Sequence, residues 1–146
     1  MSESTGGTYT LVVALDRPAT IEVGALGERV FEAGWYAYVG SARGPGGFSR
    51  IERHRELAAS ERETRHWHID YLLGHPAASI GAVFRTAGVD GECAIARSLD
   101  GERIPRFGSS DCGCDSHLVF RDSREGLVTS VERTHARLDG TTTCAV

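Results

Sequence analysis

Runs of apolar residues predict β-strands in the first part of the chain. Residues 9–15 form an almost unbroken apolar run, which is typical of a buried strand. Residues 20–23 and 28–31 predict two shorter strands, and the aromatic-rich residues 35–39 predict another, because aromatic side chains are enriched in strands. Turn-forming residues separate these runs, so we expect an early β-meander.

Helical spacing replaces this pattern further along the chain. Residues 40–47 hold four glycines and a proline, which predicts a loop. Residues 47–59 and 67–73 then carry apolar side chains every three or four positions, as amphipathic helices do. We therefore expect a strand, a glycine-rich loop and two helices in succession.

The second half of the chain predicts two more strands and two more helices. Residues 79–86 and 117–120 have the composition of strands. Asp90 is suited to cap a short helix, and Ser123 is suited to cap the last helix, because a short polar side chain can accept a hydrogen bond from the first helical turn.

The order of these elements predicts one domain of the α+β class. A chain of 146 residues is long enough for one good hydrophobic core. We expect this core within residues 7–122, a C-terminal helix at residues 123–138 and a flexible tail at residues 139–146. The fold would be a small mixed or antiparallel sheet, with the early β-meander, flanked by helices.

The charge of the chain is acidic overall but locally basic. Sixteen basic residues, all of them arginine, stand against 20 acidic residues, which gives a net charge of −4. Proteins that bind nucleic acid usually show a basic surface, so this balance speaks against such a partner. Residues 41–65 are the exception, because they hold six arginines and four glutamates.

The sequence predicts neither export nor membrane insertion. The first residues, MSESTGG, have no basic or apolar segment of the kind that signal peptides carry, and no apolar run is long enough to span a bilayer. We expect a cytoplasmic protein without membrane contact. Its four cysteines would then be reduced thiols, with a metal site as the alternative.

Candidate chemistry begins where the strand that ends in Tyr38-Val39-Gly40 enters the glycine-rich loop. A glycine-rich backbone lets a phosphate approach closely, and the arginine fork of Arg50 suits phosphate oxygens. His54 follows one helical turn later. The alternative is a plain connection followed by a solvated helix face.

An ordered set of motifs resembles the GIY-YIG nuclease superfamily. The set consists of Gly7-Thr8-Tyr9, Tyr38-Val39-Gly40, the helix segment Arg50-Ile51-Glu52-Arg53-His54, and Glu92 near the start of a later helix. The longer series GTY…GWYAYVGSA…RH…HWHIDYLL…ECAIA…FGSSDCGCDSHL resembles the Uri-type branch and spans residues 7–120. Tyr9 and Tyr38 are 29 positions apart, whereas superfamily members have a short hairpin there, so the two motif strands need not be consecutive.

The resemblance implies a metal-dependent endonuclease that hydrolyses phosphodiester bonds, with DNA favoured over RNA. It implies that Tyr38 takes the proton of the attacking water or orients that water, that Tyr9 organises the site by hydrogen bonding, and that Arg50 holds the scissile phosphate. His54 would assist as a partner or proton shuttle. Because phosphate contacts carry no sequence information, we expect selection of the substrate by its structure.

The remaining assignments concern substrate and metal. Gly40, Arg43 and His68 are expected to bind the substrate. Glu92 is expected to hold Mg²⁺ or Mn²⁺, since a single carboxylate with several waters suits Mg²⁺.

Two alternatives remain open at this point. The chain could be a non-catalytic module that binds nucleic acid or a protein partner through residues 43–65. Whichever role holds, a DNA-repair protein could be a partner. Cys112, Cys114 and His117 could also hold Zn²⁺, although C-x-C is tighter than the usual spacing of structural zinc ligands and a fourth ligand would be needed.

Overall fold

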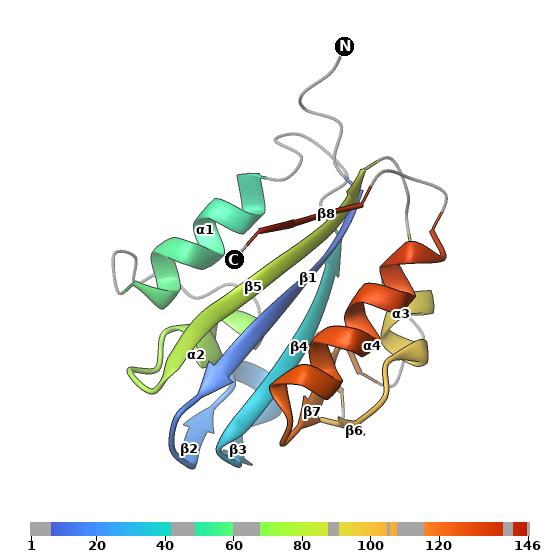
Figure 1. Ribbon diagram of the computed structural model, residues 1–146. Coiled ribbons are helices and arrows are strands. Elements are labelled where there is room, and N and C mark those ends of the chain that lie inside the picture. Colours follow the sequence, from blue (N-terminus) through green and yellow to red (C-terminus); the bar gives the residue numbers. More distant parts are fainter. Residues whose placement is uncertain are drawn as a thin grey trace.

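The fold is known from a computed structural model, which describes residues 7–41, 49–59, 68–87, 91–104, 106–107, 116–138 and 142–145. The elements in chain order are β1 (Gly7–Leu15), β2 (Ala19–Glu22), the short 3-10 helix η1 (Gly24–Leu26), β3 (Glu28–Phe31), β4 (Gly34–Ser41), α1 (Ser49–Ala58), α2 (His68–Leu73), β5 (Ala78–Ala87), α3 (Glu92–Ser98), β6 (Glu102–Arg103), β7 (Leu118–Arg121), α4 (Arg124–Ala136) and β8 (Thr142–Ala145) (Figure 1).

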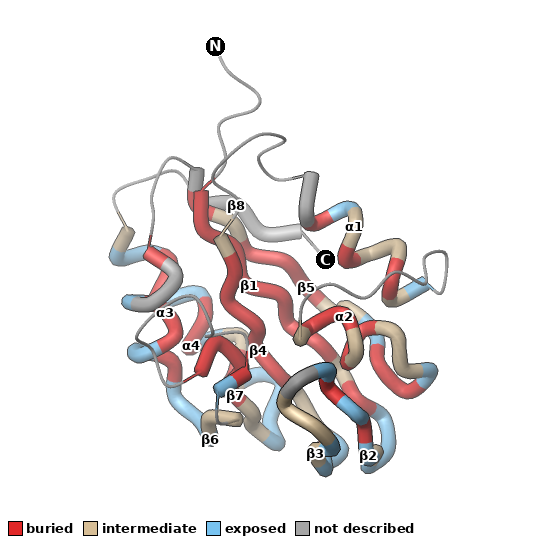
Figure 2. Tube along the Cα trace, turned by 180° about the vertical axis from the view of Figure 1, so that it is seen from behind, coloured by how far each residue is buried: buried red, intermediate tan, exposed pale blue. Residues whose placement is uncertain are grey.

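The main sheet has six strands in the order β6-β7-β4-β1-β5-β8, and each of these neighbouring pairs is antiparallel. The apolar run at the start of the sequence becomes a central strand, β1, in which eight of the nine residues are buried. Figure 2 shows β1, β4 and β5 buried along most of their length. This architecture confirms the α+β class.

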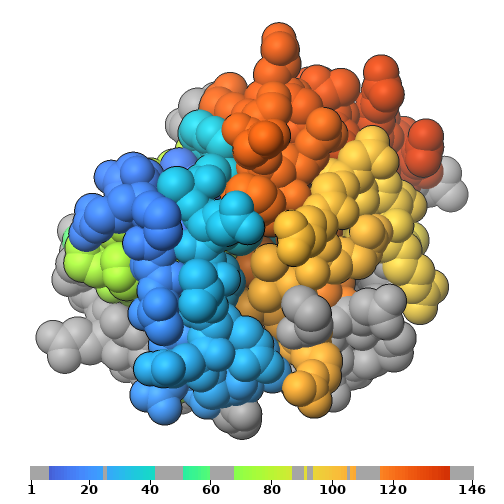
Figure 3. Space-filling view, turned by 90° about the horizontal axis from the view of Figure 1, so that it is seen from below, coloured from blue at the N-terminus to red at the C-terminus, as the bar shows by residue number. Residues whose placement is uncertain are grey.

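The early strands form as expected, but they do not form one continuous meander. β2 and β3 pair only with each other, as a separate two-stranded sheet, and β1 pairs directly with β4. Figure 3 shows this hairpin in blue at the surface. As a result, Tyr9 and Tyr38 lie on adjacent strands, with Tyr9 opposite Gly40 and Tyr38 opposite Leu11.

Two helices cover each face of the main sheet. On one face, Tyr9, Leu11 and Val13 of β1 pack in one cluster with apolar residues of α1 and α2. On the other face, Val12 packs with apolar residues of α3 and α4. Figure 1 shows these two layers on opposite sides of the strands. Neighbouring residues of β1 therefore serve two different cores, as the alternation of side chains along a strand requires.

The C-terminal tail differs from the expectation. Residues 142–145 form β8, which pairs with residues 83–86 of β5, so the prediction of a flexible tail is wrong for this segment. The physical reason is that β5, with ten residues, would otherwise present an unpaired edge of backbone donors and acceptors. The two-residue strand β6 was also not predicted.

The helix caps agree with expectation in one case. The Ser123 hydroxyl accepts a hydrogen bond from the Gly126 amide at 3.1 Å, which confirms the cap of α4. At α3, Gly91 occupies the capping position without a side-chain hydrogen bond, and Asp90 lies outside the described residues. Among the helices that the structure describes, none is both long and apolar enough to cross a membrane.

Candidate active site

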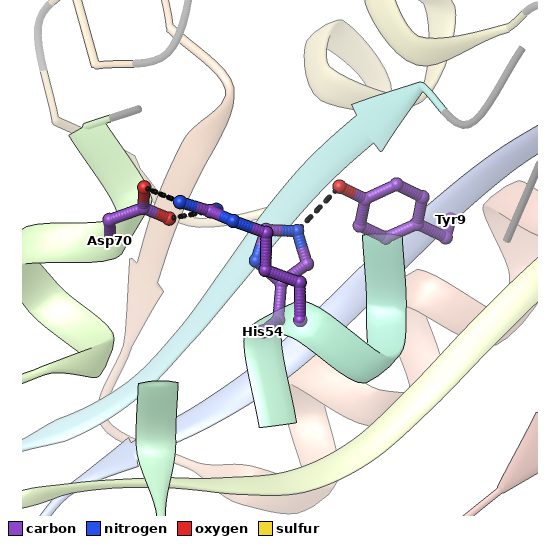
Figure 4. A network of polar contacts seen from close by, with 4 residues as sticks. Tyr9, His54 and Asp70 are labelled. Atoms are coloured by element: carbon purple, nitrogen blue, oxygen red, sulfur yellow. Dashed lines mark hydrogen bonds and ion pairs between the residues drawn. The ribbon is translucent and has the colours of Figure 1, made fainter. Parts of the chain in front are cut away.

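Tyr9 and His54 form the centre of the candidate site. The Tyr9 hydroxyl and His54 Nε2 lie 2.7 Å apart and share a hydrogen bond, in which the tautomer of the imidazole decides which group donates (Figure 4). Tyr9 is 2% exposed and His54 is fully buried. A hydrogen bond removed from water in this way is electrostatically stronger than an exposed one, so the pair holds α1 against β1 with a defined geometry.

Tyr38 completes a cluster around the same imidazole. Its ring lies edge-on to His54, with the ring centroids 6.1 Å apart, and it also contacts Phe107 with the centroids 6.4 Å apart. Tyr38 is 8% exposed, more than Tyr9. Two phenols from adjacent strands therefore flank one histidine, and the catalytic roles expected of these three residues stay predictions.

Gly40 has a packing role beside Tyr9. A Cβ atom at Gly40 would lie 2.5 Å from both Cζ and the hydroxyl oxygen of Tyr9, which is too close for any side chain. The absence of a side chain therefore allows the Tyr9 ring to lie across β4 and reach His54. The substrate-binding role expected of Gly40 stays a prediction.

A buried ion pair between α1 and α2 was not foreseen. The two terminal guanidinium nitrogens of Arg53, Nη1 and Nη2, donate to Asp70, one to each carboxylate oxygen, at 3.0 Å. Asp70 is fully buried, and the Arg53 side chain is 13% exposed. In the view of Figure 4, His54 lies between Tyr9 and Asp70. The sequence signal for this contact was Asp70 itself, a carboxylate among apolar helix positions.

The segment around Phe107 and His117 is tied to β4 beside Tyr38. The Val39 amide donates to the His117 carbonyl at 2.9 Å, and the His117 amide donates to the Phe107 carbonyl at 2.8 Å. The ring of the half-buried His68 packs edge-on to Phe107, with the two ring centroids 5.6 Å apart. Burial lowers the pKa of both His68 and His117, which favours their neutral forms.

Three predicted residues are only partly placed or not placed. Arg50 lies in the first turn of α1, one turn before His54, but its side chain is outside the described part. Arg43 lies wholly outside the described residues. Glu92 is the first residue of α3, as expected, although its side chain is also outside the described part.

The start of α3 lies near the end of β1 that carries Tyr9. The Gly91 amide donates to Thr8 Oγ1 at 2.8 Å, which brings the residue before Glu92 beside the residue before Tyr9. The expected metal-binding role of Glu92 stays a prediction. Among the described side chains, no three histidines, cysteines or carboxylates gather as a ligand group. Of the predicted zinc ligands, only His117 is described, because Cys112 and Cys114 lie outside the described residues.

The opposite face carries a second buried histidine that sequence reasoning missed. His135 of α4 bonds Thr10 of β1 through Nε2 at 2.8 Å and Thr86 of β5 through Nδ1 at 2.9 Å. Burial lowers the pKa of His135 to about 4. Both nitrogens of this neutral imidazole make hydrogen bonds, and these bonds hold α4 against β1 and β5.

Comparison with known proteins assigns the chain to a family. Residues 8–140 match the model of the family described as Domain of unknown function DUF123, and the chain belongs to that family. The match includes Tyr9, Tyr38, His54, Glu92 and the Arg53–Asp70 pair. Searches of the curated proteins and of the solved structures gave no significant match.

Proposed function

We propose that this protein is a metal-dependent endonuclease of the GIY-YIG type, which hydrolyses phosphodiester bonds of structured DNA. The observation that carries the proposal is the convergence of Tyr9, Tyr38 and His54. These residues come from three motifs that are far apart in the sequence, yet the hydroxyl of the first bonds the imidazole of the third, and the ring of the second packs against it.

The cluster suits the chemistry of phosphodiester hydrolysis. The reaction needs an activated water and groups that neutralise the charge developing on the phosphate. Tyr38 is the more exposed phenol, so it is the one to meet the attacking water, while the buried Tyr9–His54 pair fixes the position of α1. A tyrosine has a reference pKa near 10, so nearby cations are needed to stabilise the phenolate form that can accept a proton. Arg50, one turn before His54, would supply such a charge and hold the scissile phosphate.

A divalent cation would be held by Glu92. Mg²⁺ or Mn²⁺ binds carboxylate oxygens, keeps several waters and neutralises charge on the phosphate when bound. The bond between Gly91 and Thr8 supports this assignment, because it keeps the first residue of α3 at the strand end that carries Tyr9, although α3 itself packs on the opposite face of the sheet.

A non-catalytic module is the second candidate function. The near-complete burial of both tyrosines favours it, as does the net charge of −4. Such a module would bind nucleic acid, or a DNA-repair protein, without cleaving, and zinc at Cys112, Cys114 and His117 would only stabilise it. The two candidates differ in their need for Mg²⁺ at Glu92.

The test is cleavage of labelled single-stranded, duplex, flapped and branched DNA and RNA, with Mg²⁺, Mn²⁺ or a chelator. We expect cleavage of a flapped or branched DNA, a loss of about 10²–10³-fold or more for Arg50→Ala and Glu92→Gln, and no cleavage in chelator. Arg133→Ala and Glu125→Gln are matched controls, because both residues are exposed on α4, and Glu125, like Glu92, lies in a first helical turn.

The outcomes separate the two candidates. Unchanged cleavage by Arg50→Ala and Glu92→Gln contradicts the proposed site. Binding of nucleic acid without cleavage under any metal or salt condition favours the non-catalytic module instead.

A further inference from the structure

The strand register places an arginine beside Tyr9 that no motif includes. Tyr9 of β1 lies opposite Gly40 on one side and opposite Arg85 of β5 on the other. Directly opposed residues of antiparallel strands point to the same face of the sheet, with their Cβ atoms about 4.5–5.5 Å apart. Arg85 is therefore a sheet neighbour of Tyr9, although the two are distant in the sequence.

The packing around β5 confirms which face Arg85 belongs to. Val83, two residues earlier, packs in the cluster that contains Tyr9, whereas Phe84 packs in the cluster on the opposite face. By the alternation along a strand, Arg85 then lies on the Tyr9 face. The Tyr9 ring leans over Gly40, toward β4 and therefore away from β5. Arg85 is half-buried, so part of its side chain reaches the surface.

Two arginines of α1, Arg53 and Arg55, have side chains that the structure describes, and neither is a sheet neighbour of Tyr9 as Arg85 is. Arg53 is engaged by Asp70 through two hydrogen bonds. Arg55 lines an open cavity of about 280 Å³ together with Ser79 and Ile80, near the start of β5. Arg85 lies near the other end of β5, where the register sets it opposite Tyr9.

We infer that Arg85 binds a phosphate of the nucleic-acid chain beside Tyr9, as a second phosphate-holding arginine of the site. This inference rests on the proposed function, since it names a substrate-binding residue of the same site. The planar guanidinium can donate two parallel hydrogen bonds to phosphate oxygens, and it keeps its positive charge at all working pH values. Together with Arg50 in the first turn of α1, it would place cationic groups on two elements of one face.

The test measures binding separately from cleavage. A fluorescein-labelled DNA duplex with a single-stranded flap is titrated in chelator, at several salt concentrations, with the wild type, Arg85→Gln, Arg85→Lys and Arg50→Ala. We expect Arg85→Gln to weaken binding about tenfold at low salt and to reduce the slope of log K against log salt by about 0.7–0.9, the value for one lost phosphate contact. Arg85→Lys should restore the slope, because it keeps the charge. Arg133→Gln, an exposed arginine on the opposite face, is the control and should leave both quantities unchanged.

Each outcome has a distinct meaning. An unchanged slope in Arg85→Gln, with a reduced slope in Arg50→Ala, overturns the role of Arg85 and leaves the proposed function intact. A wild type that binds no DNA overturns both. A reduced slope in Arg85→Gln, without cleavage by the wild type, supports Arg85 while contradicting the nuclease. Thermal melting verifies that the variants are folded. If Arg85 had only a structural role, Arg85→Lys would have a lower melting temperature and would not restore the salt slope.

Discussion

On each face of β1 a buried histidine joins a helix to the strand, but the groups around the two histidines differ. Tyr9 and Thr10 are consecutive, so their side chains point to opposite faces, and the hydroxyl of each bonds a buried histidine of a helix. Both histidines, His54 and His135, are fully buried. Burial and a hydrogen bond to a strand hydroxyl are therefore common to both, and they do not distinguish a candidate active site from a structural contact.

The neighbours of the two histidines make the difference. His135 bonds two threonine hydroxyls, groups that do not titrate in the physiological range, and α4 is thereby clipped to two strands. His54 lies between two phenols, follows an arginine engaged in a buried ion pair, and belongs to the helix that begins near Arg50. The comparison teaches that the two buried histidines differ in the ionisable groups around them, and this difference is what makes His54 the candidate for a functional role.

The largest expected effect is on cleavage, and it should differ between substitutions of the two histidines. Under the proposed function, His54→Gln should lower cleavage about 10²–10⁴-fold, the range for a group that assists proton transfer. His135→Gln should keep cleavage within about threefold of the wild type while lowering the stability of the fold. Single-turnover cleavage and urea unfolding of both variants provide the measurement. Equal losses of cleavage in the two variants, at temperatures where both are folded, would contradict the division between the faces.

The pH dependence of stability is the second expected effect. The pKa of His135 is about 4 in the folded protein and about 6.5 in the unfolded chain, so the unfolded state binds more protons between these values. The free energy of unfolding should therefore fall as the pH drops from about 6.5 to about 4, by on the order of 3 kcal/mol from this group.

Urea unfolding at pH 7, 5.5 and 4 measures this loss. The lowered pKa values of His68 and His117 act in the same direction, so the part due to His135 is the difference between the wild type and His135→Gln. The same measurement on His54→Gln tests whether this pH-dependent loss of stability belongs to His135, the histidine that bonds two threonines, and not to buried histidines in general. A pH profile of His135→Gln that parallels that of the wild type would contradict the assignment.

The smallest expected effect compares one glycine on each face. A Cβ at Gly40 would lie 2.5 Å from the Tyr9 ring, whereas a Cβ at Gly81 would lie 3.1 Å from the Trp35 ring. Gly40→Ala should cost about 1–3 kcal/mol of stability by overpacking. It should also lower cleavage, because it displaces Tyr9 from His54. Gly81→Ala should cost less and leave cleavage unchanged; unfolding and cleavage assays of both variants check this, and normal cleavage by Gly40→Ala would show that the Tyr9 position is not critical.

Much of the fold was predictable because its signals are local. The apolar run of β1, the aromatic run of β4 and the Ser123 cap each depend on a few neighbouring residues, and each prediction is confirmed. The tail was misjudged because TTCA carries a weak signal, and its strand exists through pairing with β5. Propensity cannot reveal a partner that lies elsewhere in the chain.

The candidate site follows the same division. The sequence by itself determined that this chain is α+β, and it singled out Tyr9, Tyr38, His54 and the helix that begins at Glu92, because motif order and periodicity are written along the chain. Only the tertiary structure decided that Arg53 pairs with Asp70, that His135 joins two threonines, and that Arg85 lies opposite Tyr9. The physical reason is that strand register and helix packing bring distant residues within contact distance, and these depend on how all the apolar surfaces are buried together.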